Sequence, residues 1–447
     1  MSYSILTAHS LSERVFTLSY PMWPVAIKDQ MVRAKLVIQA SIKSGLVKPG
    51  SKFQQEQLII VGAGVTGVTA FLIAKNYNVQ TCLIEKGVRP FDRLNSERPL
   101  DPFLYDWPTN RWTERCFPIN DTYYPLEIDS VLALQQVQRW SILLKMEKEK
   151  ILYETFVTEL PGNRVSLFNK RKNLSETKSF GMLLYCTGPG KEIFEIGDYT
   201  GFPFWSYNIY VEKYAGCGSQ PNVLTVGGGD GAIQDFIQMV IESEGGSLAT
   251  RRLWEAIEDE FRDDPSTLKD IKDYIFQIED QANRKYIWST GKDEDNAINL
   301  WVHNQYNNIF IDQKNKLPRF FKIIDKIRRK DIKSIHFVHT NQGFSKCFPI
   351  NHFLGLLLIE YFKYRDFDFF YLNNTKVNDI NRKEKNDEPK TPFKNIIEKA
   401  HYCHGKDHVV SFDNGERNTY QVIILRLGIA PPSCSPPPMT RQILPFE

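Results

Sequence analysis

The chain has 447 residues, of which 42% are hydrophobic and 24% are charged, a composition that excludes a largely disordered protein. Its length exceeds a single ordinary hydrophobic core, so we expect two α/β domains. The formal charge of +3 gives no overall field for nucleic acid or a membrane surface, and we expect neither as a partner. The seven cysteines are odd in number and widely spaced, and residues 1–10 do not resemble a signal peptide, so we expect a cytoplasmic location.

Hydrophobic periodicity predicts a helix, a strand–helix–strand unit, a proline-rich loop, a long helix and short strands, then a second glycine-rich unit, a charged helical stretch and closing strands. In that order, the predicted ranges are 24–46 for the first helix, 58–62, 65–77 and 79–85 for the first unit, 89–125 for the loop, 128–150 for the long helix, 151–158, 164–168 and 181–186 for the short strands, 222–242 for the second unit, 243–333 for the helical stretch, 334–339 for the strand after it, and 408–412 and 420–427 for the closing strands.

Residues 62–67, Gly-Ala-Gly-Val-Thr-Gly, directly follow an apolar strand and open a helix. In this setting Gly62 permits the tight turn, Gly64 lets backbone amides approach a pyrophosphate, and Gly67 lets the helix pack on the strand. The helix N-terminus stabilises the phosphate charge. Glu85, at the end of the next strand, can accept hydrogen bonds from a ribose diol and would repel a 2′-phosphate, which favours FAD or NAD over NADP here. The predicted cofactor-binding residues of this unit are Gly62, Gly64, Val65, Thr66, Gly67, Glu85 and Lys86.

The chain resembles the two-dinucleotide-binding flavoproteins, the superfamily of NAD(P)H-dependent flavin reductases and flavin monooxygenases, in LIIVGAGVTGVTAFLIAKNYNVQTCLIEKG, LLYCTGPG and VLTVGGGDGAIQDF. The resemblance covers about half of the chain. It implies a Rossmann-type α/β fold in which the first glycine unit holds FAD. It also implies that a strand ending in Thr-Gly, here Thr187 and Gly188, contributes to the cofactor site. NADPH or NADH is then the expected co-substrate.

The second glycine motif is Gly-Gly-Gly-Asp-Gly-Ala at residues 227–232, which reads as GxGxxA. The resemblance implies that this unit binds NAD(P)H, and a small last residue is associated in the family with NADP. The predicted contacts are Gly227, Gly229, Asp230 and Ala232. Two features depart from the family: the next strand is delayed by roughly ninety residues, and His339 stands where an arginine is common. A second unit that binds no nucleotide is the alternative.

The resemblance also implies a division of the chain into four parts. They are an N-terminal extension and helix at 1–57, the first part of the FAD-binding domain at 58–190, an inserted NAD(P)-binding-like domain at 191–372 with a helical insertion at about 243–333, and a return to the FAD-binding domain at 373–447. The strand at 422–427 is expected to close the FAD-binding domain. The family's usual Gly-Asp pair is absent near this strand, and Arg426 occupies the neighbourhood instead.

Residues 98–108 combine arginine, acids and aromatic side chains without core periodicity. An arginine near a flavin would stabilise the anionic reduced ring, and an indole could stack on a flat substrate. Arg98, Asp106 and Trp107 are therefore the candidates for a substrate site, although no general acid or base can be assigned. The alternative is a loop whose aromatic side chains pack on the first domain and whose Asp106 caps a turn.

These features predict an FAD-dependent oxidoreductase, reduced by NAD(P)H, that passes electrons to a small organic substrate or dioxygen. The alternative is a non-catalytic FAD- or NAD-binding protein that uses the helical insertion to bind a protein partner or to signal. The basic segment 314–333 offers such a partner a charged helix face. We expect no metal site, because the histidines at 401–408 match no standard zinc spacing.

Overall fold

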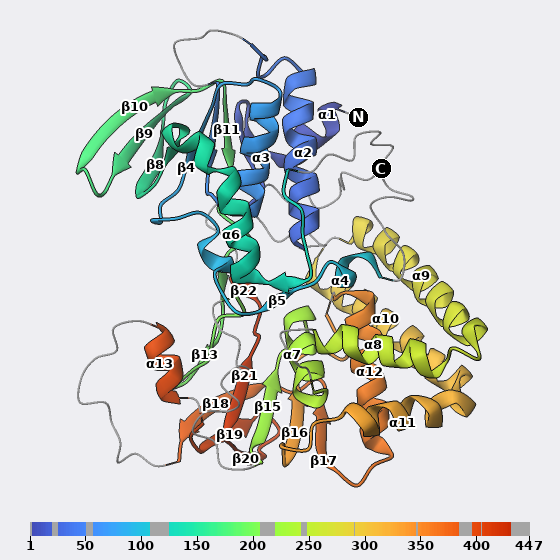
Figure 1. The fold of residues 1–447 in the computed structure, drawn as a ribbon. Helices are drawn as coiled ribbons and strands as arrows, with labels where there is room; N and C mark the ends of the chain where they lie inside the picture. The colour runs from blue at the N-terminus through green and yellow to red at the C-terminus, as the bar shows by residue number, and fades with distance from the viewer. Residues whose placement is uncertain are drawn as a thin grey trace.

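The computed structural model describes residues 2–19, 26–50, 57–107, 125–205, 220–242, 248–289, 291–345, 347–383, 396–403 and 405–430. Two α/β units, each built on a largely or wholly parallel sheet, lie one above the other in Figure 1. The predicted Rossmann-type α/β fold class is therefore confirmed. No described helix combines the length and the apolar character that a membrane span needs.

The upper unit contains a six-stranded sheet in the order β1-β2-β11-β3-β4-β7, parallel except at β1. Its strands are β1 (Ser10–Ser12), β2 (Val15–Thr17), β3 (Leu58–Val61), β4 (Thr81–Ile84), β7 (Ile151–Leu152) and β11 (Met182–Tyr185). Side chains alternate between the faces of a strand, so Leu58 and Ile60 pack on helices, whereas Ile59 packs on an antiparallel meander. The covering elements are α1 (Ser2–His9), α2 (Ile27–Lys43) and α3 (Val65–Asn76) on one face, and β8 (Thr155–Leu160), β9 (Arg164–Asn169) and β10 (Leu174–Ser179) on the other.

The observed strand pairing differs from the division into domains that the sequence predicts. Residues 2–19 and 26–50 belong to the upper unit and are not an appendage, because β2 pairs in parallel with β11 and α2 packs against α3. The expected closing strand is instead β21 (Val422–Leu425), which pairs with β15 (Asn222–Val226) in the lower sheet. The prediction that residues 422–427 return to the first domain is therefore wrong. A short run of apolar residues is suited to either buried sheet, so its sequence alone does not select its neighbour.

The lower unit has a four-stranded parallel sheet in the order β17-β16-β15-β21. Its remaining strands are β16 (Ser334–Val338) and β17 (Asp368–Leu372), its helices α7 (Asp230–Val240) and α12 (Pro349–Lys363) cover one face, and the antiparallel strands β18 (Val377–Arg382), β19 (His408–Phe412) and β20 (Arg417–Tyr420) cover the other. Strand β16 does pair with β15, so the delayed strand completes a second strand–helix–strand unit.

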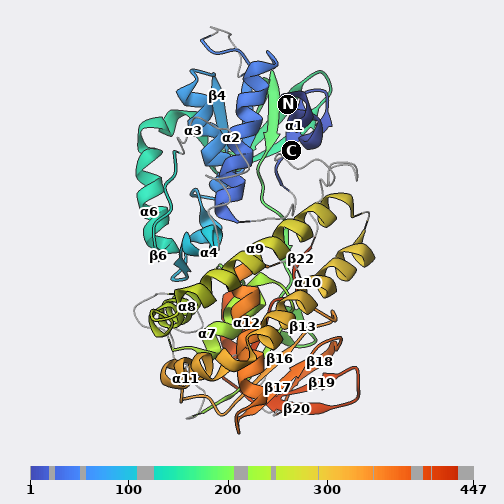
Figure 2. The same cartoon turned by 90° about the vertical axis from the view of Figure 1, so that its right-hand side faces the viewer.

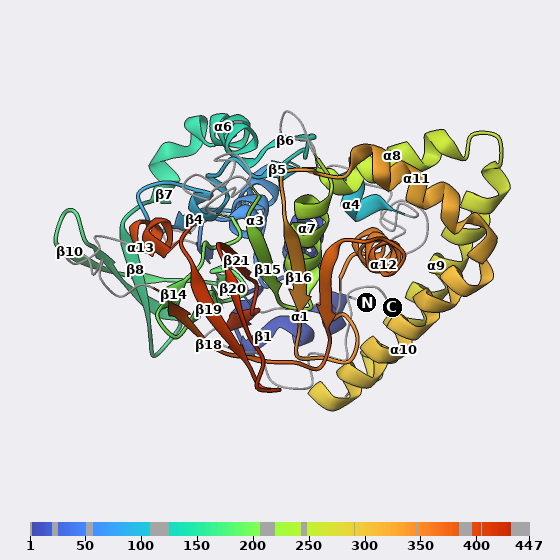
Figure 3. The same cartoon turned by 90° about the horizontal axis from the view of Figure 1, so that it is seen from below.

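Four helices separate α7 from β16. They are α8 (Ala249–Glu260), α9 (Pro265–Trp288), α10 (Lys292–Asp312) and α11 (Leu317–Ile327), with the short η3 (Lys314–Lys316) before α11. Figure 2 shows α9 and α10 along the outside of the molecule, and Figure 3 places them on the side opposite the β8–β10 meander. The basic residues of α11 do not form a free charged face. The ion pairs join Lys316 to Asp264, Arg319 to Asp263, and Lys322 and Lys326 to Glu260.

The remaining elements are shorter, and some of them run between the two units. They are η1 (Asp92–Leu94), β5 (Pro99–Leu100), α4 (Phe103–Asp106), β6 (Val131–Leu132), α6 (Ala133–Leu143), η2 (Lys145–Lys150), β12 (Lys191–Glu192), β13 (Glu195–Ile196), β14 (Tyr199–Thr200), α13 (Ile396–Cys403) and β22 (Ile429–Ala430). Strand β12, which follows the upper sheet in the chain, pairs with β22, which follows the lower sheet. The carboxyl ends of the two sheets are thus tied together.

Candidate functional site

The first glycine turn follows β3 and is packed tightly at its two ends. Gly62 has a φ of 104°, and a Cβ added there would lie 2.5 Å from the carbonyl oxygen of Cys186. A Cβ at Gly67 would lie 1.8 Å from the carbonyl oxygen of Gly62. The turn and the helix after it therefore require glycine at both positions for contacts within the protein.

Gly64, the middle glycine, is different. It is the N-cap of α3 with a φ of −77° and a ψ of −174°, an extended conformation that any residue adopts. A Cβ added there would meet no atom within 4 Å. Nothing in the surrounding protein requires glycine here, and a side chain would fill the space in front of the first helical turn. That open space suits the pyrophosphate of a dinucleotide, with the adjacent Val65 and Thr66 at the start of the helix.

Glu85 follows β4 beside this turn, and its carboxylate already has two partners. One oxygen accepts a hydrogen bond from the backbone N–H of Ala63 (2.8 Å) and the other from the backbone N–H of Gly87 (2.7 Å). The carboxylate is thus fixed against the glycine turn, where a ribose bound to the turn would meet it. Lys86 is exposed to solvent next to it. Contacts of Glu85 and Lys86 with a nucleotide remain predictions.

The Thr-Gly element lies next to the first turn, as the resemblance implies. The backbone N–H of Thr187 donates to Ser19 Oγ (2.7 Å), and Gly188 has a φ of 89°. A Cβ at Gly188 would lie 3.1 Å from Nη1 of Arg93, so this exposed guanidinium lies directly over Gly188. Neither Ser19 nor Arg93 is among the residues predicted from the sequence. The only sequence signal that could have indicated Arg93 is its position, because it is a basic residue a few positions after Glu85.

The second glycine turn repeats the geometry of the first. Gly227 has a φ of 131°, and a Cβ there would lie 2.2 Å from the carbonyl oxygen of Arg426. Ala232 is fully buried at the position equivalent to Gly67. Gly229 is the N-cap of α7 in an extended conformation, with a φ of −90° and a ψ of 176°, and nothing would lie within 4 Å of its Cβ. The middle glycine is again the one that the protein itself does not require.

Asp230, the first residue of α7, is bound to the protein. Its Oδ1 accepts hydrogen bonds from the backbone N–H of Phe348 (2.8 Å) and from Asn351 Nδ2 (2.9 Å), at the start of α12. Burial raises the pKa of Asp230 to about 6. The nearby backbone of Gly228 is covered by His339, whose Cβ would lie 3.2 Å from a Cβ at Gly228. Asp230 thus fixes α12 against the turn, and its contact with a nucleotide remains a prediction.

Two of the three substrate-site candidates, Arg98 and Trp107, lie in different surroundings. Arg98 is buried and donates from Nη2 to Asp235 Oδ1 (2.7 Å), while Arg426 Nε donates to Asp235 Oδ2 (2.7 Å). Burial alone would raise the pKa of Asp235, but the two guanidiniums hold it below its usual range. Arg98 therefore joins the two units through a buried ion cluster, and its contact with a flavin remains a prediction.

Trp107 belongs to the core of the lower unit. Its ring lies 4.9 Å from that of Trp254 and 6.5 Å from that of Phe353, measured between centroids. Asp106 ends α4, and its side chain lies outside the described residues. Leu104 and Trp107 pack in the core of the lower unit, and the elements around them, β5 and α4, are too short to show a hydrophobic period of their own.

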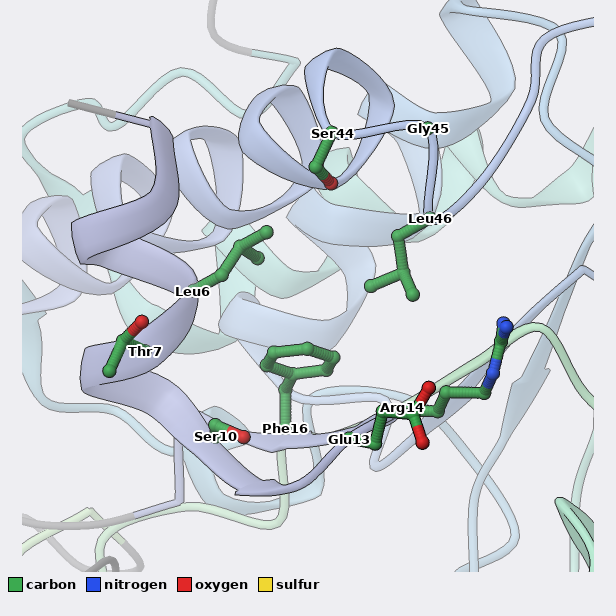
Figure 4. Close-up of a pocket in the computed structure, with 9 residues that line it drawn as sticks. All are labelled: Leu6, Thr7, Ser10, Glu13, Arg14, Phe16, Ser44, Gly45 and Leu46. Carbon is green, nitrogen blue, oxygen red and sulfur yellow. The ribbon is translucent and has the colours of Figure 1, made fainter.

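A cavity of about 390 Å³ lies where the two units meet. It is lined by the start of α2, the β5–α4 segment, β12, the second glycine turn and the residues after β21. A second cavity of about 460 Å³ lies between α1, the start of β2 and the end of α2, where Phe16 points between Leu6 and Leu46 (Figure 4). The second cavity is at the amino edge of the upper sheet, away from the glycine turn at its carboxyl edge.

No protein-family model matches the sequence, and no curated protein does. Among solved structures, a thioredoxin reductase from Lactococcus lactis is 12% identical with a TM-score of 0.38, over 84% of this chain and 78% of that one. A bacillithiol disulfide reductase from Staphylococcus aureus is 11% identical with a TM-score of 0.37, over 85% and 78% of the two chains. An ornithine hydroxylase from Pseudomonas aeruginosa is 12% identical with a TM-score of 0.37, over 85% and 84%.

Proposed function

We propose that the protein is an FAD-dependent oxidoreductase in which the first glycine turn binds FAD and the second binds NAD(P)H. Electrons from NAD(P)H then reach a small organic substrate or dioxygen. The observation that carries this proposal is the repeated geometry of the two turns. In each turn the first and last positions of the motif hold glycine or alanine because neighbouring protein atoms leave no room for a larger side chain. The middle glycines, Gly64 and Gly229, face open space.

The backbone conformation strengthens this reading of the middle glycines. Both are helix N-caps, where Ser, Thr, Asp and Asn are preferred because their side chains bond to the free N–H groups of the first turn. Gly64 and Gly229 make no such bond. Their helices therefore keep backbone donors available to an anion, and two such sites on facing units suit two dinucleotides.

Glu85 supports FAD over NADP at the first turn. A carboxylate held beside the turn by two backbone N–H groups can accept from a ribose hydroxyl, but it would repel a 2′-phosphate. The flavin, when bound, would supply the hydride-accepting chemistry, and the protein would supply position and electrostatics. We propose a cytoplasmic location, because the described cysteines, Cys82, Cys186, Cys347 and Cys403, are buried thiols outside disulfides.

The test uses the purified full-length protein. We expect an oxidised-flavin absorbance spectrum and release of FAD on boiling. Anaerobic mixing with NADPH or NADH should then bleach the flavin bands. A colourless protein that cannot be reconstituted with FAD would rule out the first assignment, and FAD that neither nicotinamide bleaches would rule out the second.

A further inference from the structure

The carboxylate of Asp230 lies at the start of the helix that follows the second glycine turn. Asp230 is the first residue of α7, directly after the N-cap Gly229, and it lines the cavity of about 390 Å³ between the two units. The backbone N–H groups of this helical turn are the donors that we assign to the pyrophosphate of NAD(P)H. A bound nucleotide would therefore bring a second anion to the helix end that already holds Asp230.

The two oxygens of this carboxylate differ in their contacts. Oδ1 of Asp230 accepts both hydrogen bonds, one from the backbone N–H of Phe348 (2.8 Å) and one from Nδ2 of Asn351 (2.9 Å). Within the described part of the chain, no group donates a hydrogen bond to Oδ2. Asn351 is itself held in place, because its Oδ1 accepts from Thr250 Oγ1 (3.0 Å) on α8. Oδ2 can therefore take up a proton while Oδ1 keeps both of its contacts.

The surroundings of Asp230 disfavour its ionised form. Burial and the charge of Asp235, one turn further along α7, raise the pKa of Asp230 to about 6, although the hydrogen bonds to Oδ1 act in the opposite direction. The arginines nearest to this pair of acids, Arg98 and Arg426, form their ion pairs with Asp235. None of the described lysines and arginines forms an ion pair with Asp230.

The other titratable groups around this helix end are uncharged or bound to other partners. Burial makes three of them uncharged near neutral pH, by raising the pKa of a thiol or lowering the pKa of an imidazole, and these are Cys347, His352 and His339. Three more belong to the facing elements and are bound elsewhere, and these are Asp101 and Arg251, which form an ion pair, and Glu192, which accepts from a backbone N–H. Asp230 is thus the carboxylate next to the turn whose charge is least stabilised by its neighbours.

We propose that Asp230 takes up a proton from solvent when the pyrophosphate of NAD(P)H binds at the second glycine turn, so that this site binds the dinucleotide more tightly in mildly acidic than in alkaline solution. This inference rests on the proposed function, because it concerns the nucleotide assigned to that turn. Two like charges at one helix end disfavour each other, and of the two the carboxylate is the one that can become neutral near pH 6. The proton can arrive through the cavity, because Asp230 lines it and is only partly buried.

A bound pyrophosphate stabilises the protonated form of Asp230 and so raises its pKa further. If this rise is about one unit, the Kd of the dinucleotide is on the order of tenfold larger at pH 8, where Asp230 is mainly ionised with or without nucleotide, than at pH 5.5, where it is mainly protonated in both states. Between these limits binding takes up protons, about half a proton per nucleotide at pH 6.5.

Isothermal titration calorimetry of the purified full-length protein with NAD⁺ measures this uptake. NAD⁺ has no 2′-phosphate, a group that would itself titrate near pH 6. Titrations in buffers of different ionisation enthalpy give the number of protons taken up, and titrations at about pH 5.5, 6.5 and 8 give the Kd at each pH. We expect about half a proton at pH 6.5 and a Kd that rises on the order of tenfold from pH 5.5 to pH 8.

Asp230→Asn separates the charge of this side chain from its hydrogen bonds. The amide keeps an acceptor oxygen for Phe348 and Asn351 but carries no charge. The variant should bind NAD⁺ at pH 8 about as tightly as the parent does at pH 5.5, without proton uptake. The matched control is Asp293→Asn, because Asp293 is an exposed acid in the first turn of α10, a helix to which we assign no nucleotide. This control should take up protons as the parent does, and melting temperatures of both variants report their folding.

The outcomes distinguish this inference from the proposed function. Nucleotide binding with no proton uptake in the parent, or with equal uptake in the parent and Asp230→Asn, would overturn the inference and leave the proposed function in place. If the parent binds NADP⁺ but not NAD⁺, the same comparison uses NADP⁺, because protons taken up by its 2′-phosphate are common to parent and variant. If Asp230→Asn does not fold, the proton uptake of the parent decides alone. Binding of neither nucleotide at any of the three pH values would overturn the assignment of the second turn, and the inference with it.

Discussion

Asp235 is the anion of the buried ion cluster between the units, and Asp235→Ala should destabilise the protein strongly. Its two oxygens each accept a hydrogen bond of 2.7 Å, one from Arg98 and one from Arg426. The side chain of Asp235 is 0% exposed, that of Arg98 3% and that of Arg426 10%. The substitution leaves two buried guanidiniums without their carboxylate, and breaking a buried ion pair in this way costs about 3–5 kcal/mol.

Urea denaturation of parent and variant measures this loss as a change in the free energy of unfolding. The control is Asp129→Ala, because Asp129 pairs with Arg139 at the surface, where both side chains are at least half exposed. An exposed pair of this kind contributes about 0–1 kcal/mol. A loss of less than about 1 kcal/mol for Asp235→Ala would show that the cluster does not hold the units together.

Three further predictions concern the first turn and the buried histidines. Glu85→Ala should raise the Kd for FAD and also lower the melting temperature, since it removes the acceptor expected for the ribose together with the charge-assisted hydrogen bonds, of about 1.5–3 kcal/mol each, from the backbone N–H groups of Ala63 and Gly87; an unchanged Kd in a titration of apoprotein with FAD would place the nucleotide elsewhere. Arg93→Ala should also raise that Kd, because it removes the cation over Gly188, and unaltered FAD retention would exclude this role. Burial lowers the pKa of His303 and, together with the charge of His303, that of His339, each to about 4. The folded state then binds fewer protons than the unfolded state between pH 6.5 and pH 4. The free energy of unfolding should therefore fall as the pH is lowered through this window, by at most about 3 kcal/mol per histidine. Urea midpoints that do not change across this window would contradict the prediction.

The two strand–helix–strand units could be predicted from the sequence because each has a local signature. An apolar strand, a glycine turn and an amphipathic or apolar helix follow one another without interruption at residues 58–77 and 222–242, and the structure has these elements in both places. The insertion delays β16 but does not change its pairing, because β16 is a buried apolar strand like β15. Hydrophobic periodicity was sufficient to predict a strand or helix whose own residues show the pattern.

The remaining features depend on partners that are distant in the chain. Arg98 and its partner Asp235 are 137 positions apart, and no local pattern links them. Strand β2 belongs to the upper sheet because it pairs with β11, whereas the comparably apolar β21 pairs with β15 in the lower sheet. Arg93 became a candidate only when its distance to Gly188 was known. Side chains that act through such long-range contacts cannot be assigned from spacing alone.

Stopped-flow reduction by NADPH and NADH of three glycine variants, compared at equal FAD occupancy, tests the central claim most directly. Gly64→Val should lower FAD retention, and Gly229→Val should retain FAD and the fold but abolish flavin bleaching, because each side chain fills the open space of its own turn. The control is Gly291→Val, since Gly291 is the N-cap of α10 and also has no atom within 4 Å of its Cβ position. This variant should match the parent in FAD content and bleaching rate. Equal bleaching rates in the parent and Gly229→Val would contradict the assignment of NAD(P)H to the second turn.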